Sequence, residues 1–332
     1  MLRYSLRQLE YFVTTAKCRS VADAARKLNV SQPSVSKAIT NLEGQFSTQL
    51  FIRHHAKGVS LTQAGERLLV DAGSLLRYAN DLQQSALDSG ELITGQIEVA
   101  SFMSVAPVFM PALITDFQQI YEGISIRLHE GNQEKLVSGL NSGRYELALM
   151  FDLNLPEEIS IEKMAAFNPY ILLPEGHPQA SNESVFLRDM MDDKLVLLDI
   201  PPSREYFLGI FHSIGLEPPV TFSSSSLEMV RGMVGQGQGY SLLVTHPHLD
   251  FTYDGQRIVT LPLADDIPRV DLGIACHKQI RPTRAMRLFL DFCANWFRQH
   301  YPRGGSCRAE PPLYNQSAGS LREAGRAFTP FP

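Results

Sequence analysis

Several kinds of segment are missing from this 332-residue chain. No apolar run reaches the roughly 18 residues that a transmembrane helix requires. The first residues, MLRYSLRQLEYF, contain no continuous hydrophobic stretch of the kind found in secretory signals. Cysteine is scarce, and its four positions are too scattered for a disulfide framework: Cys18, Cys276, Cys293 and Cys307. These absences predict a protein of the reducing cytoplasm.

Motifs for catalysis and for metal binding are also lacking. The glycine-rich segment 235–239 lies between a predicted helix and a predicted strand, the reverse of the order in a dinucleotide-binding loop. We therefore interpret it as the end of a helix. His246 and His248 have a spacing found in metal sites, but no third ligand is evident. Cys276 and His277 come without a nucleophilic triad. We expect no enzymatic activity, no cofactor and no bound metal.

Composition and charge indicate a globular protein with a distinct N-terminal part. Apolar residues make up 44% of the chain and charged residues 20%, which is enough for buried cores. At about 100–200 residues per domain, the length corresponds to two or three domains. Residues 1–68 contain ten Lys and Arg against four Asp and Glu, whereas residues 91–332 contain 19 against 28. A basic head on an acidic body suggests that the head binds a polyanion, and chance clustering is the alternative.

The basic head has the periodicity of three short helices. Five apolar residues at helical spacing give the first helix one apolar face: Leu6, Leu9, Phe12, Val13 and Ala16. Ser20 is a typical N-cap of a second helix, with Asp23 as a capping-box-like partner. After a tight turn at Asn29, Ser31 caps a third helix, and Pro33 fits its first turn because that N–H has no helical partner. Four residues are predicted to point this helix inward: Val35, Ile39, Leu42 and Phe46.

Two short helices joined by a tight turn, the second with a polar outer face, fit a helix-turn-helix. In such motifs the N-terminal end of the second helix enters the major groove of DNA. Gln32 can pair with a base edge, and Ser34 and the helix N-terminus suit phosphate oxygens. The residues of this helix predicted to contact DNA are Ser31, Gln32, Pro33, Ser34, Ser36, Lys37 and Thr40. The alternative is an ordinary three-helix bundle with a solvated polar face.

A wing is predicted directly after these helices. Phe51 and Leu61 are placed to hold two short strands around a basic turn. Arg53 and Lys57 are predicted to contact phosphates. Two adjacent histidines at 54–55 would be candidate metal ligands, but adjacent side chains diverge on a strand, so we interpret them as solvated.

Four segments of the head follow one another in a characteristic order: Leu28 with Ser31-Gln32-Pro33-Ser34-Val35-Ser36, Leu42-Glu43, Leu50-Phe51-x-Arg53, and Leu61-Thr62-x-Ala64-Gly65. Over about sixty residues this series resembles the N-terminal domain of LysR-type transcriptional regulators. Two departures are visible. Phe46 and Ser47 stand where the family usually has Leu-Gly, which affects the turn after the recognition helix. The wing is one residue longer, which leaves open whether Lys57 replaces the family's usual arginine.

A long helix is predicted after the wing, from a cap at Thr62 to about Ser89. Its apolar residues recur at intervals of three and four: Leu68, Leu69, Ala72, Leu75, Leu76, Ala79, Leu82 and Ala86. A continuous seam of this kind favours pairing with a second copy of the helix, and the alternative is packing on the body of the same chain. The resemblance implies an antiparallel linker-helix dimer, often paired further into a tetramer.

The C-terminal two hundred residues alternate between predicted strands and helices. Strands are predicted at 96–100, 124–130, 146–151, 170–174, 195–199, 220–222, 240–244 and 270–277, and helices at 107–120, 134–142, 206–213, 227–234 and 283–300. Such alternation predicts parallel sheets covered by helices. The resemblance implies a two-lobed α/β effector domain like that of periplasmic binding proteins, with a ligand cleft between the lobes. We place the crossovers between the lobes near Ala165–Asn168 and Asp266–Arg269.

Five loop segments are predicted to meet at this cleft, because ligands in open α/β sheets lie beyond the carboxyl ends of strands. The predicted effector-binding residues are Ser101, Phe102, Met103, Ser104, Phe151, Asp152, Pro202, Ser203, Arg204, Ser225 and Thr245. For each of them a capping or turn role is the alternative. Hydroxyls and free N–H groups suit a carboxylate, and Arg204 would neutralise an acid unless it lies on the surface. An apolar or aromatic part of a ligand would suit Phe102, Met103, Phe151 and Tyr206.

Together these features predict a chain of four parts. They are an all-α winged helix-turn-helix domain at 1–62, a linker and dimerisation helix at 63–90, a two-lobed α/β effector-binding domain at 91–302 and a flexible tail at 303–332. Within the effector domain, lobe I is predicted at about 91–165 and 270–302, and lobe II at about 166–269.

We therefore predict a cytoplasmic transcriptional regulator that binds double-stranded promoter DNA as a homodimer or homotetramer, without a membrane partner. A small-molecule effector, with organic acids as one candidate class, would bind one arrangement of the lobes more tightly and so change the placement of the DNA-binding heads. One alternative is a cytoplasmic solute-binding module without specific DNA recognition. Another is an enzyme built on the two-lobed body, against which the lack of a catalytic motif argues.

Overall fold

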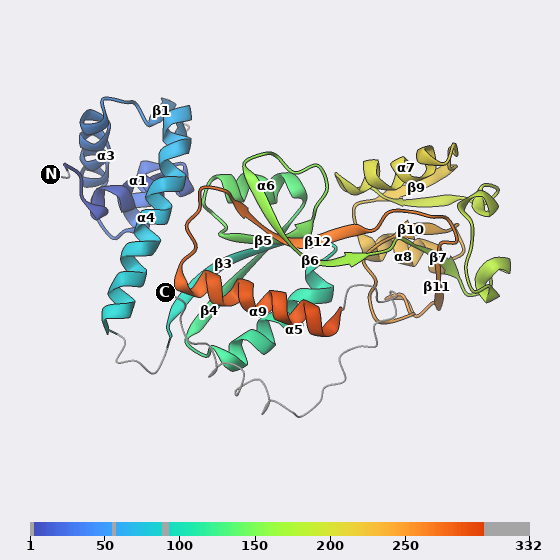
Figure 1. Ribbon diagram of the computed structural model, residues 1–332. Coiled ribbons are helices and arrows are strands. Elements are labelled where there is room, and N and C mark those ends of the chain that lie inside the picture. The colour runs from blue at the N-terminus through green and yellow to red at the C-terminus, as the bar shows by residue number, and fades with distance from the viewer. Residues whose placement is uncertain (1–2, 55–57, 88–92, 302–332) are drawn as a thin grey trace.

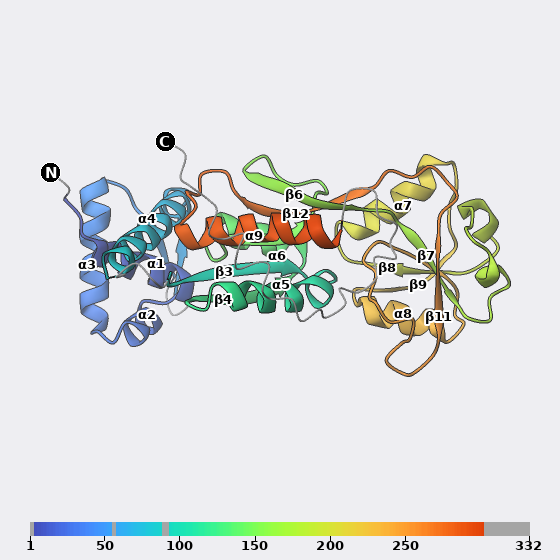
Figure 2. The ribbon, with the colours of Figure 1, turned by 60° about the horizontal axis from the view of Figure 1, so that its bottom comes forward.

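The computed structural model describes residues 3–54, 58–87 and 93–301. Figure 1 shows a helical head, a central lobe (lobe I) and a distal lobe (lobe II) in a row, and the same order is visible after a turn of 60° in Figure 2. The predicted tail at 303–332 lies outside the described residues. Within them, no helix has both the length and the apolar character needed to cross a membrane.

Within the described residues, the head consists of three helices and a two-stranded wing: α1 (Leu6–Cys18), α2 (Val21–Lys27), α3 (Gln32–Phe46), β1 (Phe51–His54) and β2 (Gly58–Leu61). Each helix is capped by a serine whose side chain accepts a backbone N–H of the first turn. Ser20 caps α2, but Asp23 pairs with Arg26 and does not complete the predicted capping box. A complete capping box joins Ser5 and Gln8 at the start of α1.

The head has an apolar core of its own, and one predicted core residue lies outside it. Phe46 is 36% exposed, and its ring contacts Tyr4 with 5.4 Å between ring centres. The prediction for Phe46 is wrong because Ser47, at φ 51°, ends α3 and turns the chain. Leu50 and Phe51 then fill the core in its place.

The long helix α4 (Gln63–Leu87) leads from the head toward lobe I (Figure 1). Thr62 caps it by accepting the Gly65 N–H at 3.0 Å. Leu69 and Ala72 are buried in the head core, so the first part of the seam packs on the head of the same chain. Leu75 and Leu82, seven residues apart on one face, are 41% and 73% exposed. The remaining seam is therefore free to pair with a second copy.

Lobe I is a five-stranded sheet with strand order β4-β3-β5-β12-β6, covered by α6 on one face and by α5 and α9 on the other (Figure 1). Its strands are β3 (Gly95–Phe102), β4 (Ile124–Gly131), β5 (Leu147–Phe151), β6 (Ile159–Phe167) and β12 (Val270–His277). Its helices are α5 (Ala106–Ile120), α6 (Gln133–Asn141) and α9 (Arg284–His300).

Lobe II contains a three-stranded sheet, β10-β7-β11, and a strand pair, β8-β9. Its strands are β7 (Tyr170–Pro174), β8 (Leu195–Leu198), β9 (Val220–Ser224), β10 (Ser241–Leu243) and β11 (Ile258–Pro262). Its helices are α7 (Ser203–Ser213) and α8 (Leu227–Gly235), with 3₁₀ turns at Pro178–Ser181 and Leu187–Met190. The chain enters this lobe between β6 and β7 and leaves it between β11 and β12.

The sheets are mixed, so the expectation of parallel sheets is wrong in part. β3 is parallel to β4 and β5, and β8 is parallel to β9. In contrast, β12 is antiparallel to β5 and β6, and β7 is antiparallel to β10 and β11. The two unpredicted strands, β6 and β11, are both among the antiparallel pairs. They arise because the chain crosses between the lobes twice, so that β12 returns beside β6 in the opposite direction.

Candidate functional site

The N-terminal end of α3 presents a polar, solvent-exposed surface. Ser31 accepts the Ser34 N–H at 3.4 Å, and the two hydroxyl oxygens lie 2.7 Å apart. On the opposite face Val35, Ile39 and Leu42 are buried against α1 and the wing. Of the predicted DNA contacts on this helix, Ser36 is half-buried and the others are exposed: Ser31, Gln32, Pro33, Ser34, Lys37 and Thr40.

The wing lies beside this helix. Phe51 pairs with Leu61 across the β1–β2 hairpin, in the predicted register. Arg53 is exposed on β1, and its guanidinium lies 3.5 Å from the Thr40 hydroxyl of α3, so wing and helix form one surface. His54 is exposed and contacts Ser60 across the hairpin. The other predicted wing residues, His55 and Lys57, lie outside the described residues.

Two polar side chains fix the wing to the helices, a task that the sequence did not reveal for either of them. The Glu43 carboxylate on α3 accepts the backbone N–H groups of Leu50 and Phe51, at 2.8 and 3.1 Å. Thr62 donates to the Gln49 carbonyl at 2.7 Å in addition to capping α4. Glu43 belongs to the Leu42-Glu43 pair of the motif, and its position on the helix face that carries the buried Ile39 and Leu42 was the available signal. These contacts set the angle of the wing against α3.

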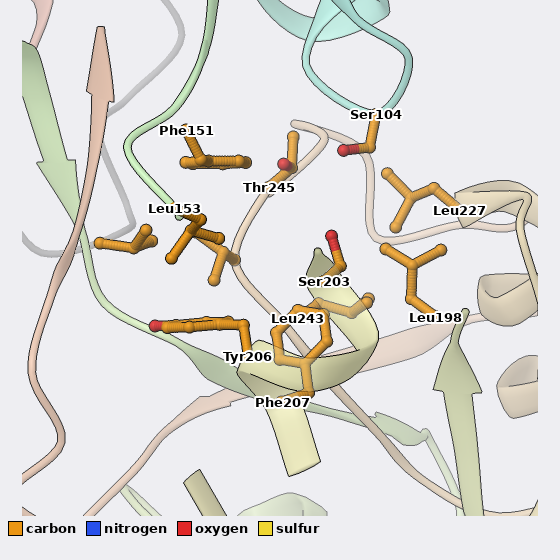
Figure 3. Close-up of a pocket in the computed structure, with 12 residues that line it drawn as sticks. Ser104, Phe151, Leu153, Leu198, Ser203, Tyr206, Phe207, Leu227, Leu243 and Thr245 are labelled. Atoms are coloured by element: carbon orange, nitrogen blue, oxygen red, sulfur yellow. The ribbon is translucent and has the colours of Figure 1, made fainter. Parts of the chain in front are cut away.

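A pocket lies between lobe I and lobe II (Figure 3). Its lining residues come mainly from the loop after β3, the end of β5, the first turns of α7 and α8, and the end of β10 with the segment after it. Its lining consists of Ser104, Phe151, Leu153, Leu198, Ser203, Tyr206, Phe207, Leu227, Leu243, Val244, Thr245 and Val270. None of these side chains is charged. The space open to the centre of a water molecule is about 10 Å³, roughly the room for one water.

Among the eleven predicted effector-binding residues, Ser104, Phe151, Ser203 and Thr245 line this pocket. Tyr206, expected to suit an aromatic part of a ligand, lines it as well. The pocket's other lining residues are apolar side chains that carried no polar signal in the sequence.

The other predicted residues point elsewhere, because neighbouring side chains at a strand end face opposite ways. Ser101 and Phe102 are buried within lobe I, while Met103 and Ser225 are exposed. Pro202, after a cis peptide bond, occupies the N-cap position of α7.

Both charged residues of the predicted set are paired away from the pocket. Arg204 donates to the Asp199 carboxylate at 2.7 Å, and this pair is part-exposed. Asp152 lies 3.4 Å from the Lys163 ammonium. Asp199 therefore already neutralises Arg204, which was predicted to be the counter-charge of an acidic effector.

Three hydroxyl groups converge on the pocket. Ser104, Ser203 and Thr245 are only 5%, 7% and 6% exposed, and Figure 3 shows their oxygens directed toward the same space. Buried hydroxyl groups normally form hydrogen bonds, so three hydroxyls that face a single pocket suit a ligand with acceptor atoms.

Two helices begin at the same pocket without a side-chain cap. Val105 and Pro202 stand at the N-cap positions of α5 and α7, and neither side chain can accept a hydrogen bond. In the first turns of these helices the N–H groups of Ser203 and Arg204 donate to the Ile200 carbonyl, and the Val108 N–H donates to the Val105 carbonyl. Each helix N-terminus carries a partial positive charge of roughly half a unit. The dipoles of the two helices therefore favour an anion at this pocket, although no cationic side chain lines it.

Tyr206 adds one further polar group. Its Oη is buried and has no hydrogen-bond partner in the described residues. Burial raises the pKa of Tyr206 to about 12, so the phenol stays protonated at neutral pH and remains a donor. In Figure 3 its hydroxyl lies away from the three converging oxygens, so it would meet a different part of a ligand.

The described cysteines lie away from the pocket lining. Cys18 and Cys276 are half-buried, and the Cys276 sulfur lies 3.3 Å from the Ser160 hydroxyl. Cys293 is buried in α9, and burial raises the pKa of its thiol. Within the described residues, no cluster of His, Cys, Asp and Glu could hold a metal ion.

Comparison with known proteins assigns both halves of the chain. Residues 6–66 match the family model "Bacterial regulatory helix-turn-helix protein, lysR family", and residues 90–298 match "LysR substrate binding domain". The first match argues against a solute-binding module that lacks DNA recognition.

Known regulators resemble the chain along most of its length. The "DNA-binding transcriptional dual regulator OxyR" of Escherichia coli K12 is 31% identical over 274 residues, which cover 81% of this chain and 88% of OxyR. The crystal structure of HinK, a LysR family transcriptional regulator from Pseudomonas aeruginosa, is 46% identical, with a TM-score of 0.61 and coverage of 89% and 99% of the two chains. Full-length CbnR complexed with its target DNA shares the fold at 21% identity, with a TM-score of 0.53 and coverage of 87% and 99%. The chain belongs to the LysR family of bacterial transcriptional regulators.

Proposed function

We propose that this regulator contacts its operator through the N-terminal end of α3 and the β1–β2 wing, and that it senses a small organic acid in the pocket between the lobes. The observation that carries the second part is the convergence of three hydroxyls from buried residues and two helix N-termini without side-chain caps on one uncharged pocket. Such an arrangement binds a carboxylate through neutral donors and helix dipoles.

The proposed function assigns a separate task to each part of the chain. We propose residues 1–62 as the DNA-binding domain, 63–90 as the linker and dimerisation helix, and 91–302 as the effector domain. The exposed Leu75 and Leu82 on α4 support its pairing with a second chain. The named relatives are regulators, which supports a protein that acts in the cytoplasm without catalysing a reaction.

At the DNA surface, different residues are assigned different tasks. Gln32, exposed at the first turn of α3, is placed to read a base edge in the major groove. Lys37, Thr40 and Arg53 lie along the helix and wing on the same side and suit backbone phosphates. Lys57, which lies outside the described residues, is proposed as a further phosphate contact.

The first experiment is selection of DNA fragments by the purified protein at two salt concentrations. An enriched near-palindromic motif that survives the higher salt would support specific readout by a symmetric dimer. Binding that disappears with salt and shows no motif would reduce the interaction to phosphate attraction and contradict the assignment of Gln32.

At the selected site, Lys37→Ala and Gln32→Ala are expected to behave differently. Lys37→Ala should weaken binding to all sequences alike. It should also reduce the slope of the logarithm of affinity against the logarithm of salt concentration by about one. Gln32→Ala should lose about 1–3 kcal/mol of discrimination at one base pair and little of the salt slope. Ser34→Ala should also weaken binding. Fluorescence anisotropy titrations at several salt concentrations measure these effects.

Lys194→Ala is the matched control for these DNA-binding variants, because Lys194 is exposed in lobe II, the lobe at the opposite end of the molecule from the head (Figure 1). It should bind as the wild-type protein does. All variants should keep the wild-type oligomer size. Unaltered affinity in both Lys37→Ala and Ser34→Ala would refute the placement of α3 on DNA.

The pocket is nearly closed in this structure, so ligand entry requires the lobes to move apart at their crossovers. A ligand that fits only the closed arrangement would shift the population toward it, by an amount equal to its difference in affinity for the two arrangements. If the open and closed arrangements of the lobes hold the DNA-binding heads at different angles, the ligand also changes the affinity for the operator.

Carboxylates with an apolar or aromatic part are expected to raise the unfolding temperature of the protein, and the corresponding amides are not. Benzoate against benzamide is a suitable first pair in a thermal-shift assay, extended to a panel of small acids. Ser203→Ala should weaken binding roughly tenfold or more, because a hydrogen bond to a charged group contributes about 1.5–3 kcal/mol. Arg204→Ala should retain the response, because Arg204 is paired with Asp199. If only neutral or cationic compounds raised the unfolding temperature, the proposal of an acidic effector would be refuted.

Some named relatives are hydrogen peroxide-inducible genes activators. In the described part of this chain the pocket offers hydroxyls rather than thiols, and Cys293 is buried with a raised thiol pKa. We therefore propose reversible ligand binding, and not oxidation of a described cysteine, as the signal.

A further inference from the structure

A buried ion pair joins the long helix of the head to lobe I. The Arg77 guanidinium on α4 lies 3.2 Å from the Glu146 carboxylate, and the two side chains are 21% and 3% exposed. Glu146 is held in place from the other side, because its second carboxylate oxygen accepts the Glu98 N–H of β3 at 2.9 Å. The Glu146 N–H in turn donates to the Glu98 carbonyl at 2.8 Å. The carboxylate is therefore part of lobe I, and Arg77 is its partner from the head.

Other contacts gather around this pair. The Tyr78 hydroxyl on α4 donates to the Pro282 carbonyl of lobe I at 3.1 Å. Burial and the charge of Arg77 lower the pKa of Lys17 at the end of α1, and the carboxylates of Glu98 and Glu146 oppose that shift. The end of α1 thus faces the same cluster.

The wing is hydrogen-bonded to the end of α1 that faces this cluster. The Val59 N–H of β2 donates to the Arg19 carbonyl, which lies directly after α1, at 3.0 Å. The junction therefore touches the elements that carry the DNA surface, and a shift of α1 against lobe I would move the wing.

Two neighbouring strands connect this junction to the pocket. Glu98 lies in β3, which leads into the loop that carries Ser104. Glu146 directly precedes β5, which ends at Phe151 in the pocket lining. The two strands are parallel and hydrogen-bonded to each other, and they run from the head side of lobe I toward lobe II (Figures 1 and 2). A displacement at their carboxyl ends is thereby transmitted to Glu98 and Glu146 without a flexible segment between.

We propose that the Arg77–Glu146 pair is the positioning contact through which lobe I holds the DNA-binding head at a defined angle, with β3 and β5 connecting it to the pocket. The proposal rests on the proposed function in one respect, namely that the pocket is where the signal arrives. Arg77 and Glu146 are positioning residues, since neither touches DNA or the pocket. A buried pair suits this task because its geometry is directional and because losing either partner leaves a desolvated charge.

The test measures the head angle in the full-length protein without DNA and without ligand. Fluorophores are introduced through unnatural amino acids at Glu10 on α1 and Glu122 of lobe I, both exposed, so that no native cysteine is altered. Labelled chains are mixed with excess unlabelled chains, so that each oligomer reports one intrachain distance by single-molecule energy transfer. The variants are Glu146→Gln, Arg77→Met and the double variant. Glu130→Gln, which removes an exposed carboxylate from lobe I, is the matched control.

The wild-type protein and Glu130→Gln are expected to give one narrow distance distribution. Glu146→Gln and Arg77→Met should each broaden or shift it, and the double variant should do no more than either single variant, because all three remove the same contact. Circular dichroism establishes that each variant is folded. Arg77→Lys serves as the conservative variant if Arg77→Met fails to fold, and it should give an intermediate distribution.

A second readout uses the selected operator. Glu146→Gln, Arg77→Met and the double variant should change affinity for the complete site about tenfold, the scale of a typical coupling energy. Affinity for a single half-site should change less than about twofold, because the recognition surface of one head is unchanged. A wild-type distance distribution in folded Glu146→Gln and Arg77→Met would overturn the proposal. Neither readout involves a ligand, so the proposal can fail while the acid site stands, and the benzoate assay can fail while this contact stands.

Discussion

Gly65→Ala is expected to weaken specific DNA binding strongly while lobes I and II stay folded. A Cβ atom at this position would lie 2.2 Å from the Leu50 carbonyl oxygen and 2.9 Å from a methyl group of Leu61. Both neighbours belong to the wing, and the Leu50 oxygen is main chain that cannot rotate away. Gly65 also donates its N–H to Thr62, so the first turn of α4 is fixed at the point of the clash.

Relief of this clash requires the wing to move away from α4. Overpacking of a tight contact destabilises by about 1–3 kcal/mol, and sometimes more, and here the displaced element carries part of the DNA surface. We expect the head to unfold at a lower temperature and affinity for the selected operator to fall at least about tenfold, since 1.4 kcal/mol corresponds to a factor of ten. Thermal unfolding followed by circular dichroism and anisotropy titration measure the two effects.

Gly44→Ala is the matched control. Gly44 lies in α3, and a Cβ atom there would meet nothing within 4 Å. Because alanine is the better helix former by about 1 kcal/mol, this variant should be as stable as the wild-type head or more so. If Gly65→Ala unfolded at the same temperature as Gly44→Ala and bound DNA normally, the prediction would be wrong. The start of α4 would then move freely against the wing, contrary to the contacts of Thr62.

The head could be predicted closely because its determinants are local in sequence. Ser20 and Ser31 mark helix starts in the sequence, because each side chain accepts the backbone N–H of the residue three positions later. The pairing of Phe51 with Leu61 follows from a short hairpin whose ends must meet. The exception is Phe46, whose apolar character suggested burial, while the turn at Ser47 decided otherwise.

The pocket could be predicted only as a region. Strand ends identified the loops that carry Ser104, Ser203 and Thr245, but not which neighbouring side chain turns inward. Ser101 and Ser104 are equally polar in the sequence, and their different places depend on the geometry of the turn after β3. The apolar lining gave no signal, since a pocket leucine such as Leu198 cannot be told from a core leucine by pattern.

Long-range charge pairs were not predictable at all. Arg77 and Glu146 lie far apart in the sequence and meet only because α4 returns against lobe I. For Arg204 the sequence suggested a free charge, whereas the fold pairs it with Asp199 at the start of α7 and leaves no charge for a ligand. In both cases the fold, and not the residue type, decides whether a charge is available.

Arg231→Ala is expected to be among the most destabilising single substitutions in lobe II. Arg231 lies on α8, is 2% exposed, and donates to the carbonyls of Leu249 and Phe251 at 2.7 and 3.0 Å. Its guanidinium also lies 3.3 Å from the Glu228 carboxylate. The side chain thus joins α8 to the segment after β10, and both elements contribute to the pocket lining. Truncation leaves two carbonyl groups unpaired and opens a cavity.

The size of the effect distinguishes burial from charge pairing as its cause. Removal of one partner from a buried pair costs about 3–5 kcal/mol, whereas exposed pairs contribute about 0–1 kcal/mol. Arg257→Ala is the control, because Arg257 pairs with Glu175 at 2.8 Å while both side chains are more than half exposed. Urea unfolding of the full-length variants should show a large loss for Arg231→Ala, a loss near zero for Arg257→Ala and little recovery in Arg231→Lys, since an ammonium group cannot reproduce the planar fork. Equal losses for the two alanine variants would mean that the exposed pair contributes as much as the buried one, and the role assigned to Arg231 in holding α8 beside the pocket would fall.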